Sequence, residues 1–252
     1  MSQVFARNGD SKTITDDQQT TLPDALLDSE SSTPHIHIAI LGTGFAGLGM
    51  AIQLKQHGHN DFVIIERAGD IGGTWRDNTY PGCACDIPSH LYSFSFALNP
   101  QWSRMYSPQR EIRDYLRRCA RRFGILPHIR WHSDLLDASW NEDDQCWHIT
   151  TSQGQLHADI FILGNGPLNE ASLPPIAGIE NFEGVMFHSS QWRHDYDLTG
   201  KRVAVIGTGA SAVQFVPHIQ PRVGKLSLNN HKIIVSVLLK LNRHAQAREA
   251  RP

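Results

Sequence analysis

The sequence predicts an α/β fold made of two Rossmann-like units, the second of them incomplete. Two observations lead to this fold class. An apolar run of strand length, a glycine-rich turn and a helix pattern follow one another around residues 35–58, and the same order returns around residues 201–219. The hydrophobic content of 40% in 252 residues is enough for one large domain or two modest ones.

The chain divides into four parts by composition and pattern. Residues 1–34 are rich in Ser, Thr, Asp and Gln and show little periodicity, so we expect a disordered arm. Residues 35–170 are predicted to form the first unit, and residues 171–228 begin the second. Residues 229–252 look like a divergent tail.

The first unit opens with the apolar run 35–41, which precedes a glycine-rich turn. A helix is expected at residues 48–57 and a buried strand at residues 61–65, with Glu66 directly after it. This order of strand, turn, helix, strand and acid predicts a dinucleotide-binding site. The turn has the pattern G-x-G-x-x-G and consists of Gly42, Thr43, Gly44, Phe45, Ala46 and Gly47.

Each conspicuous residue of this unit has an expected role. Gly42 permits the tight turn, Gly44 lets the backbone approach a pyrophosphate, and Gly47 lets the helix pack closely on the strand. The free N–H groups at the helix N-terminus face the phosphates. Glu66 is then placed to accept a hydrogen bond from a ribose hydroxyl.

The segment after Glu66 carries a longer motif. Gly72-Gly73-Thr74-Trp75 is followed by Tyr80-Pro81-Gly82 and by Asp86. This segment resembles the flavoprotein monooxygenases of the Baeyer–Villiger type, including those like 4-hydroxyacetophenone monooxygenase. Their pattern [A/G]-G-x-W-x4-[F/Y]-P-[G/M]-x3-D is matched at every specified position.

The resemblance implies roles for four residues near a flavin. Thr74 and Trp75 are expected to lie along FAD, and Asp86 is expected in the active site near the flavin ring as the catalytic candidate. A tyrosine shortly after that aspartate contacts FAD in the family, which implicates Tyr92.

A second fingerprint of the same family follows. Phe182-x-Gly184-x3-His188-x3-Trp192 matches its pattern, except that Arg193 replaces the usual Pro or Asp. The tryptophan favours the Baeyer–Villiger branch over the related N- and S-oxygenating enzymes, which usually carry Tyr there. His188 is expected beside the cofactors, where a linker role that couples domain movement is as plausible as a chemical one.

The second glycine-rich turn follows the strand pattern at residues 201–206. Its pattern is G-x-G-x-x-A, and a helix with an apolar face comes next. Two such turns imply two dinucleotides, and by resemblance these are FAD at the first turn and NADPH at the second. The second turn consists of Gly207, Thr208, Gly209, Ala210, Ser211 and Ala212.

Other elements are expected between the two turns. A helix is predicted from Arg110 to Phe123, with Ser107 as its cap and Pro108 at its first position. Its arginines are interpreted as a solvated face, not as a nucleic-acid site. Strands are predicted at residues 129–131, 134–140, 146–151 and 155–163.

Composition limits partners and location. The net charge of −2 gives no reason to expect nucleic acid or a membrane surface. Four cysteines without a secretory signal suggest free thiols and a cytoplasmic protein. Cys83-x-Cys85 lacks a second pair at zinc spacing, so no metal site is expected, and His35 and His37 are expected to face solvent. The apolar run 233–241 is too short to span a bilayer.

The resemblance implies an oxygenating enzyme. NADPH would reduce FAD, and the reduced flavin would use O2 to convert a ketone into an ester or lactone. N- or S-oxygenation is the alternative activity. A non-catalytic flavin-binding remnant is another, because the resemblance stops after Leu228 and His231 stands where the family has an NADP-selecting arginine. We therefore expect a truncated form without turnover.

A disulfide reductase is disfavoured, since Cys83-x-Cys85 lacks the usual spacing.

Overall fold

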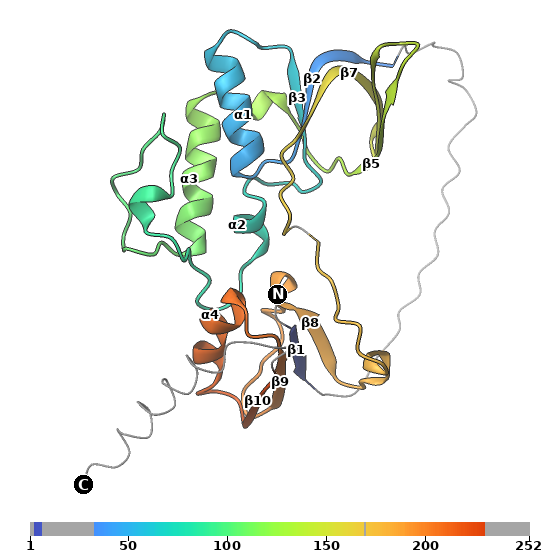
Figure 1. Ribbon diagram of the computed structural model, residues 1–252. Coiled ribbons are helices and arrows are strands. Elements are labelled where there is room, and N and C mark those ends of the chain that lie inside the picture. The colour runs from blue at the N-terminus through green and yellow to red at the C-terminus, as the bar shows by residue number, and fades with distance from the viewer. Residues whose placement is uncertain (1–2, 7–32, 169, 230–252) are drawn as a thin grey trace, which may run out of the picture.

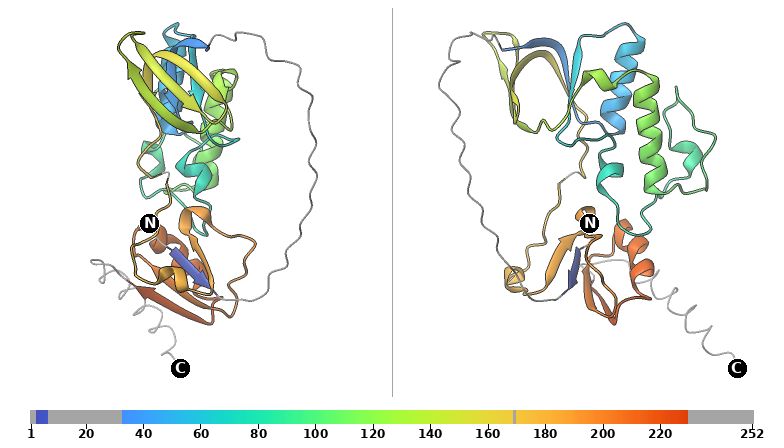
Figure 2. Two further views of the ribbon diagram at one scale, coloured as in Figure 1. Left: turned by 90° about the vertical axis from the view of Figure 1, so that its right-hand side faces the viewer. Right: turned by 180° about the vertical axis from the view of Figure 1, so that it is seen from behind.

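The computed structural model of the chain describes residues 3–6, 33–168 and 170–229. Figures 1 and 2 show two sheets in separate parts of the molecule. The larger sheet lies at the top of Figure 1 beside two long helices, and the smaller sheet lies below it. This arrangement has the α/β character expected from the sequence.

The larger sheet has the strand order β4-β3-β2-β7-β6-β5. Its first four strands in this order are parallel, while β7, β6 and β5 form an antiparallel meander. The predicted strands at residues 35–41 and 146–151 are reproduced at both ends, and the others agree within about two residues. The strands are β2 (His35–Leu41), β3 (Phe62–Ile65), β4 (Ile129–Arg130), β5 (Leu135–Asn141), β6 (Cys146–Thr151) and β7 (Gly154–Leu163).

Two helices cover one face of the parallel strands. They are α1 (Phe45–Gln56) and α3 (Gln109–Arg122). The apolar face of α3, which includes Ile112 and Leu116, is buried in the same cluster as Ile40 and Ile64 of the sheet. The meander packs on the opposite face through a second cluster that contains Ile149 and Leu156.

The predicted cap of α3 is wrong. Pro108 occupies the N-cap position, and no side chain caps the helix. The Ser107 hydroxyl lies 2.7 Å from that of Ser89 in a buried pair, so it is not available to the helix. The backbone N–H of Gln109 donates instead to the carbonyl of Cys83.

The smaller sheet has the strand order β10-β9-β1-β8. Strands β9 and β10 are parallel and flank helix α4, as in a Rossmann unit. Strand β1 lies antiparallel to both β8 and β9, which corrects the arm predicted at residues 1–34 for these four residues. Residues 1–2 and 7–32 of that arm and the predicted tail after residue 229 lie outside the described residues. The elements are β1 (Gln3–Ala6), β8 (Val185–His188), β9 (Arg202–Ile206), α4 (Ala210–Ile219) and β10 (Lys225–Asn229).

One loop ties the two parts together. Tyr80 and Cys83 belong in sequence to the first unit, yet they are buried in the core of the second beside Phe215. The Gln214 carboxamide accepts from the Tyr80 hydroxyl at 3.0 Å and donates to the Ala84 carbonyl at 2.8 Å. The remaining short elements are α2 (Thr74–Asp77), η1 (Ser89–Leu91), η2 (Leu126–His128), η3 (Ile179–Asn181) and η4 (Ser189–Gln191).

Candidate functional site

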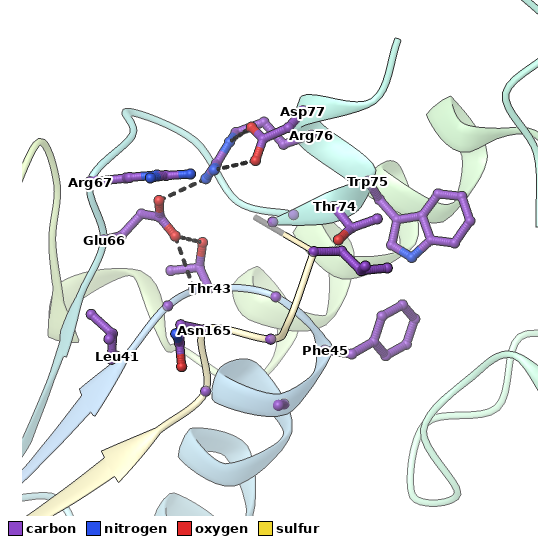
Figure 3. Close-up of a pocket in the computed structure, with 18 of the residues that line it drawn as sticks. Leu41, Thr43, Phe45, Glu66, Arg67, Thr74, Trp75, Arg76, Asp77 and Asn165 are labelled. Atoms are coloured by element: carbon purple, nitrogen blue, oxygen red, sulfur yellow. Dashed lines mark hydrogen bonds and ion pairs between the residues drawn. The ribbon is translucent and has the colours of Figure 1, made fainter. Parts of the chain in front are cut away.

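A cavity of about 530 Å³ opens at the carboxyl ends of β2, β3 and β7. Ligands of open α/β sheets bind at this edge. The cavity is walled by the first glycine-rich turn, the residues that follow β3, helix α2 and the turn that follows β7 (Figure 3). Its lining includes Gly42, Thr43, Gly44, Phe45, Ala46, Glu66, Arg67, Gly73, Thr74, Trp75, Arg76, Asp77, Tyr92, Gly164 and Asn165.

The three glycines of the first turn are required for different structural reasons. Gly42 has φ +93°, a conformation that suits glycine, and its N–H donates to the Ile65 carbonyl at 2.8 Å. A Cβ on Gly47 would lie 1.9 Å from the Gly42 carbonyl oxygen, so no side chain fits there. Gly44 has φ −74°, and a Cβ on it would meet nothing within 4 Å. Gly44 is therefore bare towards an open space.

A second glycine faces Gly44 across the cavity wall. Gly73 has φ +49°, and a Cβ on it would lie 3.3 Å from the Gly44 Cα. Gly73 is also the N-cap of α2, so two helix starts meet here without side chains between them. The first N–H groups of α1 have no partner inside that helix, whereas those of Trp75 and Arg76 in α2 donate to the Gly72 and Gly73 carbonyls. This bare cradle at the start of α1 fits a pyrophosphate.

Glu66 links the turn to the rest of the wall. Its side chain is buried, and Oε2 accepts from the Thr43 N–H at 2.9 Å and from the Thr43 hydroxyl at 2.6 Å. Oε1 accepts from Arg76 at 2.7 Å and from the Ala68 N–H at 2.9 Å. Burial of Arg76 opposes its charge, but the hydrogen bond to Asp77 and the Glu66 carboxylate outweigh this and raise the pKa of Arg76.

The other end of the cavity is aromatic. The Trp75 indole N–H donates to the Tyr92 hydroxyl at 3.1 Å, and the two rings meet edge to face. Phe45 meets Tyr92 in the same way, with ring centroids 5.0 Å apart. Burial raises the pKa of Tyr92, so this hydroxyl stays neutral at ordinary pH. Gln109 of α3 donates to the Trp75 carbonyl and holds α2 in place.

Two predicted site residues lie elsewhere. Asp86 is exposed on the loop after Cys85 and does not line this cavity. The backbone N–H of Cys85 donates to the Ser107 carbonyl, which holds the start of that loop against the chain before α3. His188 is buried at the end of β8, in the other part of the molecule.

His188 has one satisfied ring nitrogen. Nδ1 accepts from the Ser190 N–H at 3.2 Å, so the neutral ring carries its proton on Nε2. Burial lowers the pKa of His188 and keeps it neutral. Among the described residues, Nε2 has no hydrogen-bond partner. Trp192 of the same fingerprint meets Phe187 edge to face and Phe215 at a tilt, and it packs against the second core.

The second glycine-rich turn repeats the backbone of the first. Gly207 has φ +104°, and its N–H donates to the Asn229 carbonyl at 3.0 Å. Gly209 is the N-cap of α4 with an extended backbone, and Ala212 is buried. The predicted role of His231 lies outside the described residues.

Sequence reasoning missed several lining residues, among them Arg67, Glu170 and the four that follow. Arg76 and Asp77 follow the tryptophan of the motif within α2, and Gly164 and Asn165 follow β7. Arg76 and Asp77 could have been predicted, because two adjacent residues of opposite charge follow the tryptophan of the motif directly. Gly164 approaches the Gly47 Cα so closely that a Cβ on it would lie 2.9 Å away, which only the folded chain reveals.

Two general findings limit the chemistry of the site. All four cysteines are free and buried, and none lines this cavity. No helix in the described part of the chain combines the length and the apolar character needed to cross a bilayer.

Comparison with known families and proteins agrees with this geometry. Residues 39–222 match the family described as pyridine nucleotide-disulphide oxidoreductase. A Baeyer–Villiger monooxygenase of Streptomyces coelicolor is 52% identical over 203 residues, which are 81% of this chain and 39% of the relative. Another of Pseudomonas aeruginosa is 52% identical over 77% of this chain and 37% of its own length. The chain thus spans about two fifths of these relatives.

Solved structures give the same picture. Cyclohexanone monooxygenase with bound ε-caprolactone aligns with a TM-score of 0.72 and 32% identity over 78% of this chain and 39% of its own. The enzyme OTEMO in complex with FAD and NADP aligns with a TM-score of 0.73 and 33% identity, over 79% and 39% of the two chains.

Proposed function

The chain belongs to the pyridine nucleotide-disulphide oxidoreductase family, within its Baeyer–Villiger-type flavoproteins, and on that premise we propose that it serves FAD- and NADPH-dependent monooxygenation. One oxygen atom of O2 would enter an organic substrate, a ketone in the first instance. The observation that carries this proposal is the cradle formed by Gly44 and Gly73, which leaves room for a pyrophosphate.

The residues present fit FAD at the first turn. The helix start at Gly44 would hold the pyrophosphate, and Glu66 would face the ribose from the wall that it shares with Thr43 and Arg76. Trp75 and Tyr92 would border the flavin ring with apolar surface. When bound, FAD reduced by NADPH supplies the activation of O2, while the protein provides position and exclusion of water.

The second turn is proposed to bind NADPH. Its backbone repeats that of the first turn, with Gly209 bare at the start of α4. A cytoplasmic location, suggested by the free thiols, is part of the same proposal. The pocket offers no cysteine pair, so reduction of a disulfide is not supported within the family.

A second candidate function is flavin binding without turnover. The observation that favours it is the position of Asp86, which is exposed and does not line the cavity, although the resemblance made it the catalytic candidate. In this case the chain would retain FAD and fail to oxygenate any ketone.

One experiment separates the two candidates. The purified 252-residue chain is examined for flavin absorbance and is then given NADPH, O2 and a simple cyclic or aryl ketone. Bound flavin with ester formation supports the monooxygenase, and bound flavin without ester supports the second candidate. A chain that retains no added FAD contradicts both.

The placement of FAD has its own test. Gly44→Val adds a side chain where nothing lies within 4 Å, at a backbone conformation that valine adopts, so the fold should survive while flavin retention is lost. Gly209→Val, at the matching position of the second turn with φ −70°, is the control and should retain flavin. Unchanged flavin content in Gly44→Val would falsify this placement.

A further inference from the structure

The outer face of the meander gathers side chains that the proposed function does not use. His35 of β2 lies opposite His157 of β7, and His157 lies opposite His148 of β6. Side chains two apart on a strand share a face, so Cys146 stands beside His148 on the same side. Three neighbouring strands therefore bring imidazole and thiol groups together, far from the cavity at the first turn.

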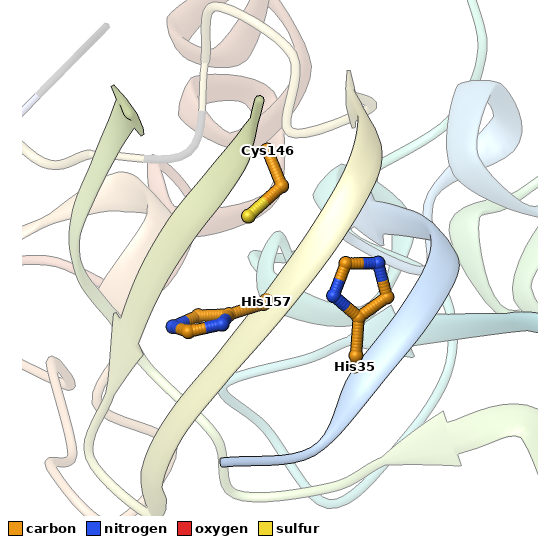
Figure 4. A group of neighbouring side chains, drawn as sticks. All are labelled: His35, Cys146 and His157. Carbon is orange, nitrogen blue, oxygen red and sulfur yellow. The ribbon is translucent and has the colours of Figure 1, made fainter. Parts of the chain in front are cut away.

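Three of these side chains point toward one another. The possible ligand atoms of His35, Cys146 and His157 all lie within 4.8 Å of one another (Figure 4). Tetrahedral coordination at zinc bond lengths spaces such atoms about 3.5 Å apart. Small rotations of the side chains would close that difference, and His35 has room for them because it lies at the exposed start of β2.

A carboxylate orients one of the three ligands. Asp159 Oδ1 lies 2.7 Å from Nε2 of His35, and its Oδ2 lies 2.7 Å from Nδ1 of His37. The Asp159 contact leaves Nδ1 of His35 for another partner, and Figure 4 shows one nitrogen of that ring toward Cys146 and His157. A carboxylate on the far nitrogen of a histidine is the usual support of a metal ligand.

The other two ligands have no competing hydrogen bond in the part of the chain that the structure describes. Within the described residues, neither the Cys146 thiol nor the His157 ring makes a hydrogen bond. Cys146 is only 2% exposed and is not part of a disulfide. The His157 ring stacks on that of His148 at 4.1 Å and 8°, which fixes its plane. Asp144 lies 2.7 Å from His148 Nε2 and adds negative charge to the face.

We propose that His35, Cys146 and His157 bind one thiophilic divalent cation of the zinc class. Thiolate and imidazole ligands select such cations over magnesium or calcium, and three protein ligands leave the fourth position to water. The cation would join β2, β7 and β6. No metal was expected from the cysteine spacing, because these ligands come from three separate strands and form no local motif.

Cobalt(II) is the probe for a test on the full chain. Difference absorbance before and after cobalt addition should show visible ligand-field bands and a near-ultraviolet thiolate-to-cobalt band, both saturating at one equivalent. Cys146→Ser should remove the thiolate band. His35→Gln and His157→Gln should each weaken binding by about tenfold or more. Cys85→Ser and the exposed His59→Gln are the matched controls and should leave the titration unchanged.

Thermal unfolding supplies a second measurement. A cation that binds only the folded state raises the melting temperature. Zinc should raise that of the unmodified chain and of Cys85→Ser, but not that of Cys146→Ser. The proposal is overturned if no thiolate band forms, if the band survives Cys146→Ser, or if His35→Gln binds cobalt as tightly as the unmodified chain. His35 is exposed, so its variant remains decisive should Cys146→Ser fail to fold.

Discussion

The two glycine-rich turns share one backbone and differ in what surrounds it. At each turn the first glycine has positive φ, near +93° and +104°, and its N–H donates to the last residue of the neighbouring parallel strand. The last residue of the motif differs between the turns. Gly47 leaves no space for a side chain, while Ala212 carries a methyl group. The motif thus fixes the turn, and neighbouring segments decide how closely the turn is enclosed.

The surroundings of the first turn come from three places in the chain. Glu66 follows β3, Gly73 is the N-cap of α2, and Gly164 follows β7; all three contact the turn or lie against it. At the second turn, Asn229 takes the place of Ile65 in the hydrogen-bond register. The residue that follows in sequence is Asn230, an amide where the first turn has a carboxylate. The comparison suggests four tests, beginning with the largest effect.

Substitutions at the last residue of the two motifs, Gly47 and Ala212, should differ most in their effect on the free energy of unfolding. Gly47→Ala forces a Cβ to 1.9 Å from the Gly42 carbonyl oxygen, so the free energy of unfolding should fall by about 3 kcal/mol or more. Ala212→Gly at the second turn should cost only about 1 kcal/mol through helix propensity. Urea denaturation measures the free energy of unfolding of both variants. Equal losses would contradict the view that the first turn is packed more tightly than the second.

The second largest effect on stability is expected at the buried carboxylate of Glu66. Glu66→Gln keeps the shape but removes the charge opposite Arg76, so we expect a loss of about 2 kcal/mol at pH 7 even without nucleotide. Glu170→Gln is the control, because this acid of the same pocket is exposed and its pairing with Arg67 is open to solvent. If Glu66→Gln were as stable as the control, Glu66 would contribute to ligand binding and not to the stability of the fold.

The threonine of the first turn should have a smaller effect. Thr43→Val removes a buried hydroxyl that donates to Glu66 at 2.6 Å, and the expected loss is about 1 kcal/mol. Thr43→Ser keeps the hydroxyl and should recover part of this loss. Equal melting temperatures for the valine variant and the unmodified chain would show that the backbone N–H of Thr43 alone holds the carboxylate.

The smallest expected effect is pH-dependent and concerns the loop between β3 and α2. Burial opposes the charge of Asp70, but the hydrogen bonds from Arg117 and the Ile71 N–H, together with the positive charges of Arg117 and Arg113, outweigh it and lower the pKa of Asp70. A lowered pKa contributes stability above the unfolded value and loses it as pH falls through the folded value. Arg117→Gln should therefore cost less than about 1 kcal/mol at pH 7, since the pair is partly exposed.

The pH series provides the check for that variant. Urea midpoints of Arg117→Gln and the unmodified chain should differ at pH 7, begin to approach each other below the ordinary pKa of the carboxyl, and converge once the pH falls below the lowered pKa of Asp70. A difference that persists unchanged at pH 3 would assign the effect of Arg117 to packing.

Much of the fold follows from local pattern. The strands and the helix of each Rossmann unit were predictable because apolar runs and glycine turns act within about ten residues. The first cavity wall was predictable in part, since Gly44, Glu66, Trp75 and Tyr92 all line it. Their contacts with a cofactor remain predictions.

Features that depend on distant pairing were not predictable. Strand β1 enters the second sheet between strands more than 170 residues away, and nothing in its four residues indicates a partner. Asp86 was assigned by motif, but its exposure depends on how the loop lies against the chain before α3. The histidine and cysteine face of the meander likewise arises only when β2, β7 and β6 align.

The anchoring of residues 80–84 to α4 has a mechanical consequence. Tyr80 and Cys83 are packed in the second core, and the Gln214 carboxamide clamps the backbone at Ala84. The same loop is also held by the larger part of the molecule, because the Cys83 carbonyl accepts from the Gln109 N–H at the start of α3 and the Cys85 N–H donates to the Ser107 carbonyl. Any hinge rotation between the two sheets would therefore strain residues 80–84, which are bonded to both parts. Such a rotation would pull on α2, and thereby transmit force from the second turn to the cradle of the first.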